Sequence, residues 1–183
     1  MFRRRPGFRR LRRAIAPGLA PQLRHGHNLL AAGSFAEAAR IFEALAGASM
    51  GAGPRSGHLL LQAGHARVLN GEQLAGVEQI LRGLQLIAAS GRAMLFDRAA
   101  RRSIEFLQQQ GLVEAASQVE QLLGGQSGSP TTAGSPPKRA QAARLPTHCP
   151  SCGAALRPDE VEWLDDVTAE CDFCGSPVRA GQA

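Results

Sequence analysis

The sequence predicts a mainly α-helical protein, built of antiparallel helical hairpins, with a small β-module at its C-terminal end. Aromatic residues make up only 4% of the 183 residues, while Ala and Leu dominate, and this composition favours closely packed helices over sheets. Apolar residues recur at helical spacing after each of three glycines, Gly33, Gly71 and Gly111. All four cysteines lie in two Cys-x-x-Cys motifs near the C-terminus.

The chain begins with a basic arm, residues 1–16, that has no acidic residue. Its seven arginines are Arg3, Arg4, Arg5, Arg9, Arg10, Arg12 and Arg13. Anionic lipid attracts such a cluster with about 1 kcal/mol per charge near the surface, and DNA or RNA attracts it through the phosphates. Docking on the protein's own acidic C-terminal module and a basic tail with no dedicated ligand are two further alternatives. The sequence does not separate them.

The residues after the arm do not form a membrane span. No run approaches 18 apolar residues, and Pro17, Gly18 and Pro21 interrupt the short apolar stretch that follows the arginines. An export signal is therefore not expected. We expect a cytoplasmic protein, with peripheral contact at the inner membrane face as an option that the basic arm leaves open.

Residues 17–124 predict three helical hairpins. The three glycines are 38 and 40 residues apart, and an amphipathic helix follows each of them. Another helical stretch precedes each glycine, at about residues 20–32, 56–69 and 92–109. Asn70-Gly71 and Ser90-Gly91 are turn signals. Ala63, Gly64 and Ala66 are small residues that would let a neighbouring helix approach closely.

This pattern resembles the tetratricopeptide family, in which helical hairpins stack and present a concave surface to protein partners. The first hairpin matches best, at Gly26, Gly33, Phe35, Ala38 and Phe42. In the second hairpin Gly64 and Gly71 match, but Gln73 and Gly76 replace an aromatic residue and an alanine. The third keeps Gly111 and Ala116, and the closing proline is missing from all three. A six-helix bundle without such stacking is the alternative.

The resemblance implies a protein-binding groove, for which the sequence offers polar candidates: Arg67, Arg82, Arg101, Arg102, Gln108, Gln109 and Gln110. Catalysis needs convergent acid, base or nucleophilic groups, and the known nucleotide, hydrolase and metalloprotease motifs are absent from the sequence. His58 and His65 are seven residues apart and could share a helix face, but no carboxylate neighbours them at a useful spacing. We therefore expect a protein that is not an enzyme and has no small-molecule substrate.

Residues 125–146 predict a flexible linker because they are rich in Gly, Ser, Pro and Thr. The cysteine module follows at residues 147–180. Cys149 and Cys152 are separated by 18 residues from Cys171 and Cys174, a spacing typical of a four-cysteine zinc site. Four thiolates close a tetrahedral shell and suit one structural Zn²⁺. The module resembles a zinc ribbon.

Two other uses of the cysteines are disfavoured. A redox Cys-x-x-Cys motif would need a βαβ context, and structural disulfides would need an oxidising compartment. His148 is surplus to four thiolates. Residues 161–164 and 167–171 predict a β-hairpin with Trp163 on a small core, and residues 176–178 predict a further short strand.

The charge is unevenly distributed and bears on the partners. Residues 1–24 carry +8, residues 25–123 are neutral, residues 124–146 carry +3 and residues 147–183 carry −5. Close contact of the acidic module with phosphate is therefore unfavourable. The sequence predicts a non-enzymatic adaptor or scaffold that binds protein partners and has a structural zinc module. The alternatives are a nucleic-acid-associated factor or a membrane-surface adaptor, both acting through the arm.

Overall fold

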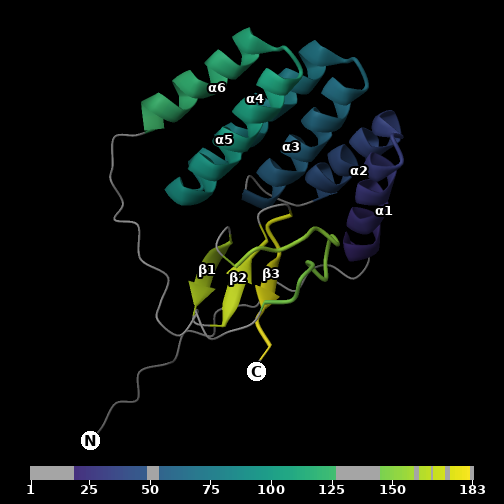
Figure 1. Ribbon diagram of the computed structural model, residues 1–183, viewed down its shortest axis with the longest axis vertical. Helices are drawn as coiled ribbons and strands as arrows, with labels where there is room; N and C mark the ends of the chain where they lie inside the picture. The colour runs from purple at the N-terminus through teal and green to yellow at the C-terminus, as the bar shows by residue number, and fades with distance from the viewer. Residues whose placement is uncertain are drawn as a thin grey trace, which may run out of the picture.

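Six helices form the body of the protein, and a small sheet lies beneath them (Figure 1). The computed structural model describes residues 19–48, 54–126, 145–158, 161–165, 167–171 and 174–181. The helices are α1 (Leu19–Ala31), α2 (Phe35–Ala48), α3 (Pro54–Leu69), α4 (Gln73–Ala89), α5 (Ala93–Gln109) and α6 (Val113–Gln126). The basic arm and most of the expected linker lie outside the described residues. None of the helices in these ranges is long and apolar enough to cross a membrane.

Three of the glycines that the sequence analysis singled out lie at the C-terminal ends of helices. Gly33, Gly71 and Gly111 adopt φ of 78°, 87° and 75°, a conformation that side chains with a Cβ rarely take. Each follows a helix and donates its N–H back to a carbonyl three residues earlier, at 3.0–3.1 Å, while the next residue bonds five residues back at 2.8–2.9 Å. This is the Schellman ending. It reverses the chain within each predicted hairpin, and Gly91 reverses it again between α4 and α5.

Helices α3 and α4 approach each other through glycines. Gly57 and Gly64 on α3 face Gly83 and Gly76 on α4, so two pairs form along the antiparallel contact. A Cβ placed on Gly64 would lie 2.7 Å from the carbonyl oxygen of Gly76, and one on Gly57 would lie 2.7 Å from that of Gly83. The backbones therefore touch where larger residues would hold them apart. Gly76, a departure from the tetratricopeptide pattern, has a packing reason here.

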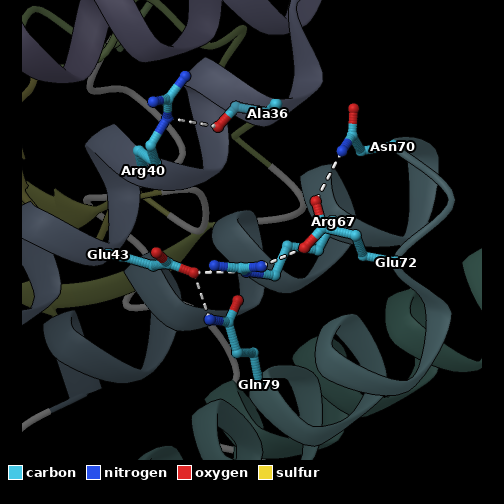
Figure 2. Close-up of polar contacts among 7 residues, drawn as sticks. All are labelled: Ala36, Arg40, Glu43, Arg67, Asn70, Glu72 and Gln79. Carbon is cyan, nitrogen blue, oxygen red and sulfur yellow. Dashed lines mark hydrogen bonds and ion pairs between the residues drawn. The ribbon is translucent and has the colours of Figure 1, made fainter.

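A polar network joins α2, α3 and the start of α4 (Figure 2). Arg67 donates from Nε to Glu43 Oε1 at 2.6 Å, and its Nη1 donates to Glu72. Gln79 of α4 also donates to Glu43, and the Asn70 amide donates to Glu72 at 2.6 Å. Arg67, a candidate for partner contact, therefore binds carboxylates within the body.

The sheet has three short antiparallel strands in the order β1, β2, β3: Glu162–Asp165, Thr168–Glu170 and Pro177–Arg179. The predicted hairpin and the extra strand are present, with each strand end shifted by one residue. Asp165 Oδ1 accepts the N–H of Val167 at 2.9 Å and closes the β1–β2 turn. Trp163 is half-buried at the edge of the core, whereas Ala169 and Val178, paired across β2 and β3, are each 1% exposed.

Buried side chains divide into two clusters. The first core is shared between the helices and the cysteine module. It contains Leu23, Ala38, Ala39, Phe42, Leu45, Leu59, Ala63 and Ala66 from α1, α2 and α3, and the four cysteines, Leu156, Val161, Ala169 and Val178 from the module. The second core is purely helical and is built by α3, α4, α5 and α6, with Ile80, Leu84, Ile87 and Leu107 fully buried. The cysteine module is therefore packed against the body.

Candidate metal centre

The first pair of cysteines lies on a tight turn whose hydrogen bonds fix its shape. The N–H of Gly153 donates to the carbonyl of Cys149 at 2.8 Å, and the N–H of Cys149 donates to the carbonyl of Ala154 at 2.8 Å. Gly153 has φ of 79°, which a residue with a Cβ would adopt only under strain. The turn thus needs the glycine that directly follows Cys152.

The second pair repeats this geometry. Gly175 donates to the carbonyl of Cys171 at 2.8 Å, Cys171 donates to the carbonyl of Ser176 at 2.9 Å, and φ of Gly175 is 63°. Equivalent residues of the two motifs thus make equivalent bonds. The similarity of the two Cys-x-x-Cys motifs in sequence is therefore matched by a similarity in backbone structure.

The two turns bring the four sulfurs together. Cys149 Sγ lies 3.8 Å from Cys174 Sγ, and Cys152 Sγ lies 3.8 Å from Cys171 Sγ. All four Sγ atoms lie within 4.8 Å of one another, and the four residues are at most 2% exposed. A disulfide has its sulfurs about 2.05 Å apart, so these cysteines are free thiols. The group could hold one metal ion.

The four thiols shift one another's pKa values because they lie so close together. Hydrogen bonds from the other cysteines, chiefly from Cys152, lower the pKa of Cys149. The same contacts, chiefly with Cys149, raise the pKa of Cys171. Four thiolates cannot be held so close together by themselves because their charges repel, whereas a bound cation makes all four stable. His148 is exposed, and its Nδ1 lies 3.1 Å from Thr147 Oγ1.

The centre lies against α1 and α3. A Cβ at Gly175 would lie 3.4 Å from both Arg55 Cα and His58 Cδ2, and Gly153 faces the side chain of Arg24. His27 of α1 packs edge-on against Phe42 with ring centroids 5.2 Å apart. Burial lowers the pKa of His27, and the nearby charge of Cys149 partly opposes that shift. The environment of the cysteines is thus formed partly by the helices.

An ion pair closes the contact between module and body. Glu170, in strand β2, accepts a hydrogen bond from Arg92, which precedes α5. The Glu170 side chain is 9% exposed and the Arg92 side chain is 21% exposed. No short pattern in the sequence indicates this partner, because the two residues are 78 positions apart. The pair is a contact between module and body that joins residues far apart in the chain.

The other residues that the sequence suggested for partner contact do not gather at one site among the described residues. The seven arginines of the arm lie outside the described residues. Arg82 and the three glutamines at the end of α5 are exposed, and Arg101 binds Asp97 on the same helix at 2.9 Å. Arg102 lines a cavity that also contains both His58 and His65.

Comparison with known proteins finds no matching family model, no significantly similar curated protein and no significantly similar solved structure. The two resemblances drawn from the sequence therefore stand on the residues alone. What the structure itself shows is a mainly helical chain with a small C-terminal antiparallel sheet, next to four cysteines that could hold one metal ion.

Proposed function

We propose that the four cysteines bind one Zn²⁺ and that this zinc has a structural role. A regular tetrahedron with Zn–S bonds of about 2.3 Å has sulfur–sulfur edges of about 3.8 Å, which agrees with the two 3.8 Å separations that link the turns. Four thiolates complete the shell, so no position is left for a reacting water. Burial of all four ligands supports the same reading.

A structural zinc would act as a cross-link for the whole first core. The module contains strands of only three or four residues, which is too little structure to be stable alone. Structural zinc contributes about 10–16 kcal/mol of apparent binding free energy. Because the module's buried side chains complete the core of α1 and α2, the metal would stabilise that end of the helical body as well.

The body itself serves, in this proposal, as a non-enzymatic scaffold for a protein partner. The observation that carries this is a groove of about 580 Å³ along α4 and α6. Two apolar side chains at its edge are unusually exposed, Leu74 at 90% and Val113 at 64%, and Glu78 and Glu114 also line it. Their position along one groove distinguishes these side chains from apolar residues scattered singly over a surface, which need no explanation, and this supports a binding role for the groove. The groove suits a partner segment with apolar and basic side chains.

The zinc assignment is tested by metal analysis of the purified full chain. We expect one zinc per chain, and replacement by Co²⁺ should give the absorption of a tetrahedral thiolate site. Cys171→Ser should abolish tight binding, whereas His148→Ala should keep one zinc because His148 is exposed next to Cys149 in the chain. A different resident metal, or full zinc retention in Cys171→Ser, would contradict the assignment.

The scaffold role is tested by capture of partners from nuclease-treated lysate with quantitative mass spectrometry, followed by binding measurements with the purified partner. The informative variant is Val113→Glu, and the matched control is Val167→Glu, because Val167 is also apolar and exposed but lies in the cysteine module. A third chain lacks residues 1–16, a deletion that spares the buried Leu23 of α1.

We expect one protein to bind the wild type, the control and the truncated chain, and to be lost with Val113→Glu. Two results would overturn the scaffold proposal. If the Val113→Glu variant still binds every partner that the wild type binds, the groove is not the interface. If nuclease treatment or the truncation removes every partner, the activity belongs to the basic arm.

A further inference from the structure

A cavity of about 180 Å³ lies between α3 and α5, and its lining includes neither the four cysteines nor any residue of the groove of α4 and α6. Its two walls are single faces of the two helices. Residues 58, 61, 62 and 65 come from α3, and residues 95, 98, 99, 102 and 103 come from α5. Their spacing of three and four residues is that of one helical stripe. The cavity is therefore built by the way these two helices face each other.

Two imidazole nitrogens of the residues that line this cavity lack hydrogen-bond partners among the described residues. His58 is 3% exposed, and its Nε2 is buried without a partner among the described residues. The Nε2 of His65 is also buried without a hydrogen-bond partner among the described residues. The His65 ring packs on Phe106 with ring centroids 4.3 Å apart. Leaving a buried polar atom unpaired costs about 1–3 kcal/mol. Such atoms mark a place for water or for a ligand.

The field inside the cavity is positive. Arg98 and Arg102 line it, together with the Gln62 amide, and none of the described residues that line it is acidic. Glu170 of the module, which lies beside Gly175 together with His58, is paired with Arg92. Both lining arginines have other interactions as well, but a guanidinium offers five N–H donors and can share them.

The pKa of His58 supports this picture. Burial lowers it to about 4, and the positive charges of Arg92 and Arg102 add to the effect. Burial also lowers the pKa of His65 to about 4. Near neutral pH both imidazoles are therefore uncharged, and each can place one N–H on a ligand. The groups available are thus two guanidiniums, two neutral imidazoles and an amide.

We propose that the cavity between α3 and α5 binds a small oxyanion through Arg98 and Arg102, with His58 and His65 completing its coordination. Guanidiniums match the oxygens of phosphate and carboxylate groups with short, charge-assisted hydrogen bonds. A cavity of about 150 Å³ holds a molecule the size of benzene, so the space admits inorganic phosphate, a compact phosphate monoester or a small carboxylate. The hydroxyl of Ser103 already donates to the Ala99 carbonyl at 2.9 Å, so the donors come from the other residues.

The test is calorimetric titration of inorganic phosphate into the metal-loaded full chain at constant ionic strength. Acetate and methyl phosphate, titrated in parallel, distinguish a carboxylate ligand from a phosphate or its monoester. We expect saturable binding of at least one of these anions at one site. Arg102→Gln should weaken it at least ten-fold, because a charge-assisted bond is lost. Arg101→Gln is the matched control, since Arg101 is on the same helix, is 65% exposed and does not line the cavity.

A second variant protects the test against a misfolded Arg102→Gln chain. Ala99 is 8% exposed and lines the cavity, so Ala99→Leu should fill the space and abolish binding while leaving every charge in place. Thermal unfolding and metal content report whether each variant is folded. The proposal is overturned if none of the anions binds saturably, if both arginine variants weaken binding equally, or if a folded Ala99→Leu chain binds as well as the wild type.

Discussion

The two cores of this protein differ in what completes them. The second core joins four helices that follow one another in the chain, from α3 to α6. The first core joins α1, α2 and α3 to a module that begins about a hundred residues after α2 ends, and the four cysteines are among its buried residues. Phe42 and Leu107 are both fully buried, yet only Phe42 belongs to the core that contains the cysteines. With the zinc proposed above, stability at one end of the body would depend on a metal centre, whereas the core at the other end is built by helix packing alone.

The largest expected effect comes from removing the metal. Chelation should unfold the cysteine module, expose the apolar face of α1 and α2 and leave α5 and α6 folded, because only the first core contains cysteine side chains. Hydrogen exchange followed by mass spectrometry measures this, with loss of protection confined to the module and the first hairpin. Equal loss of protection in α5 and α6 would show that the two cores are one cooperative unit.

Replacing one large buried side chain in each core tests whether only the first core is coupled to zinc binding. Phe42→Ala and Leu107→Ala should each cost about 3–4 kcal/mol of unfolding free energy, since both side chains are 0% exposed. Only Phe42→Ala should also speed the transfer of zinc to a competing chelator, because Phe42 packs in the core of the cysteines. Denaturant unfolding measures the change in unfolding free energy, and the kinetics of zinc transfer to a chelator measure the rate of release. The comparison fails if Leu107→Ala releases zinc equally fast.

The glycine contact between α3 and α4 should tolerate no side chain. Gly64→Ala would place a Cβ 2.7 Å from the Gly76 carbonyl oxygen, so the helices must separate at a cost of about 1–3 kcal/mol. Gly47→Ala is the matched control on α2, where a Cβ would meet nothing within 4 Å. It should raise stability slightly, because alanine is the better helix former. Thermal unfolding of both variants is sufficient, and a neutral Gly64→Ala would contradict the close contact.

Breaking the ion pair between module and body should have an effect of similar size. Glu170→Gln removes the charge that binds Arg92, and we expect a loss of about 2 kcal/mol because Glu170 is largely buried. Zinc should also become more accessible to chelators. Asp97→Asn breaks an exposed pair with Arg101 within one helix and should change neither measurement. Equal behaviour of the two variants would mean that the Glu170 pair does not hold the module in place.

The weakest predicted effect is the coupling between Glu43 and Arg67. The hydrogen bond from Arg67 is the main cause that lowers the pKa of Glu43 below its ordinary value of 4.5. A carboxyl group with a lowered folded-state pKa stabilises the fold above its unfolded pKa, and the benefit disappears as pH falls through the folded value. A double-mutant cycle of Glu43→Gln and Arg67→Gln should give a few tenths of a kcal/mol to about 1 kcal/mol near neutral pH. The coupling should vanish in acid, and one that persists there would exclude the ion pair as its source.

Much of the local structure could be predicted from the sequence. The six helices match the expected stretches closely, because helical periodicity and a glycine at each reversal are short-range signals. The two cysteine turns are equally local, since Cys-x-x-Cys-Gly specifies both the hydrogen bonds and the positive φ of the glycine. A small residue at Gly64 indicated a close helix neighbour, which the structure places at Gly76.

Only the tertiary structure decided which surfaces meet. The pairing of Glu170 with Arg92 and the common core of Phe42 with the cysteines join residues far apart in the chain. His58 and His65 share a helix face by their spacing alone, but the arginines opposite them were brought there by the packing of α5 against the rest of the body. Backbone sterics and nearby hydrogen bonds determine a helix or a turn within a few residues. The choice of contact surfaces depends on the shape and charge of whole faces, which no short pattern in the sequence encodes.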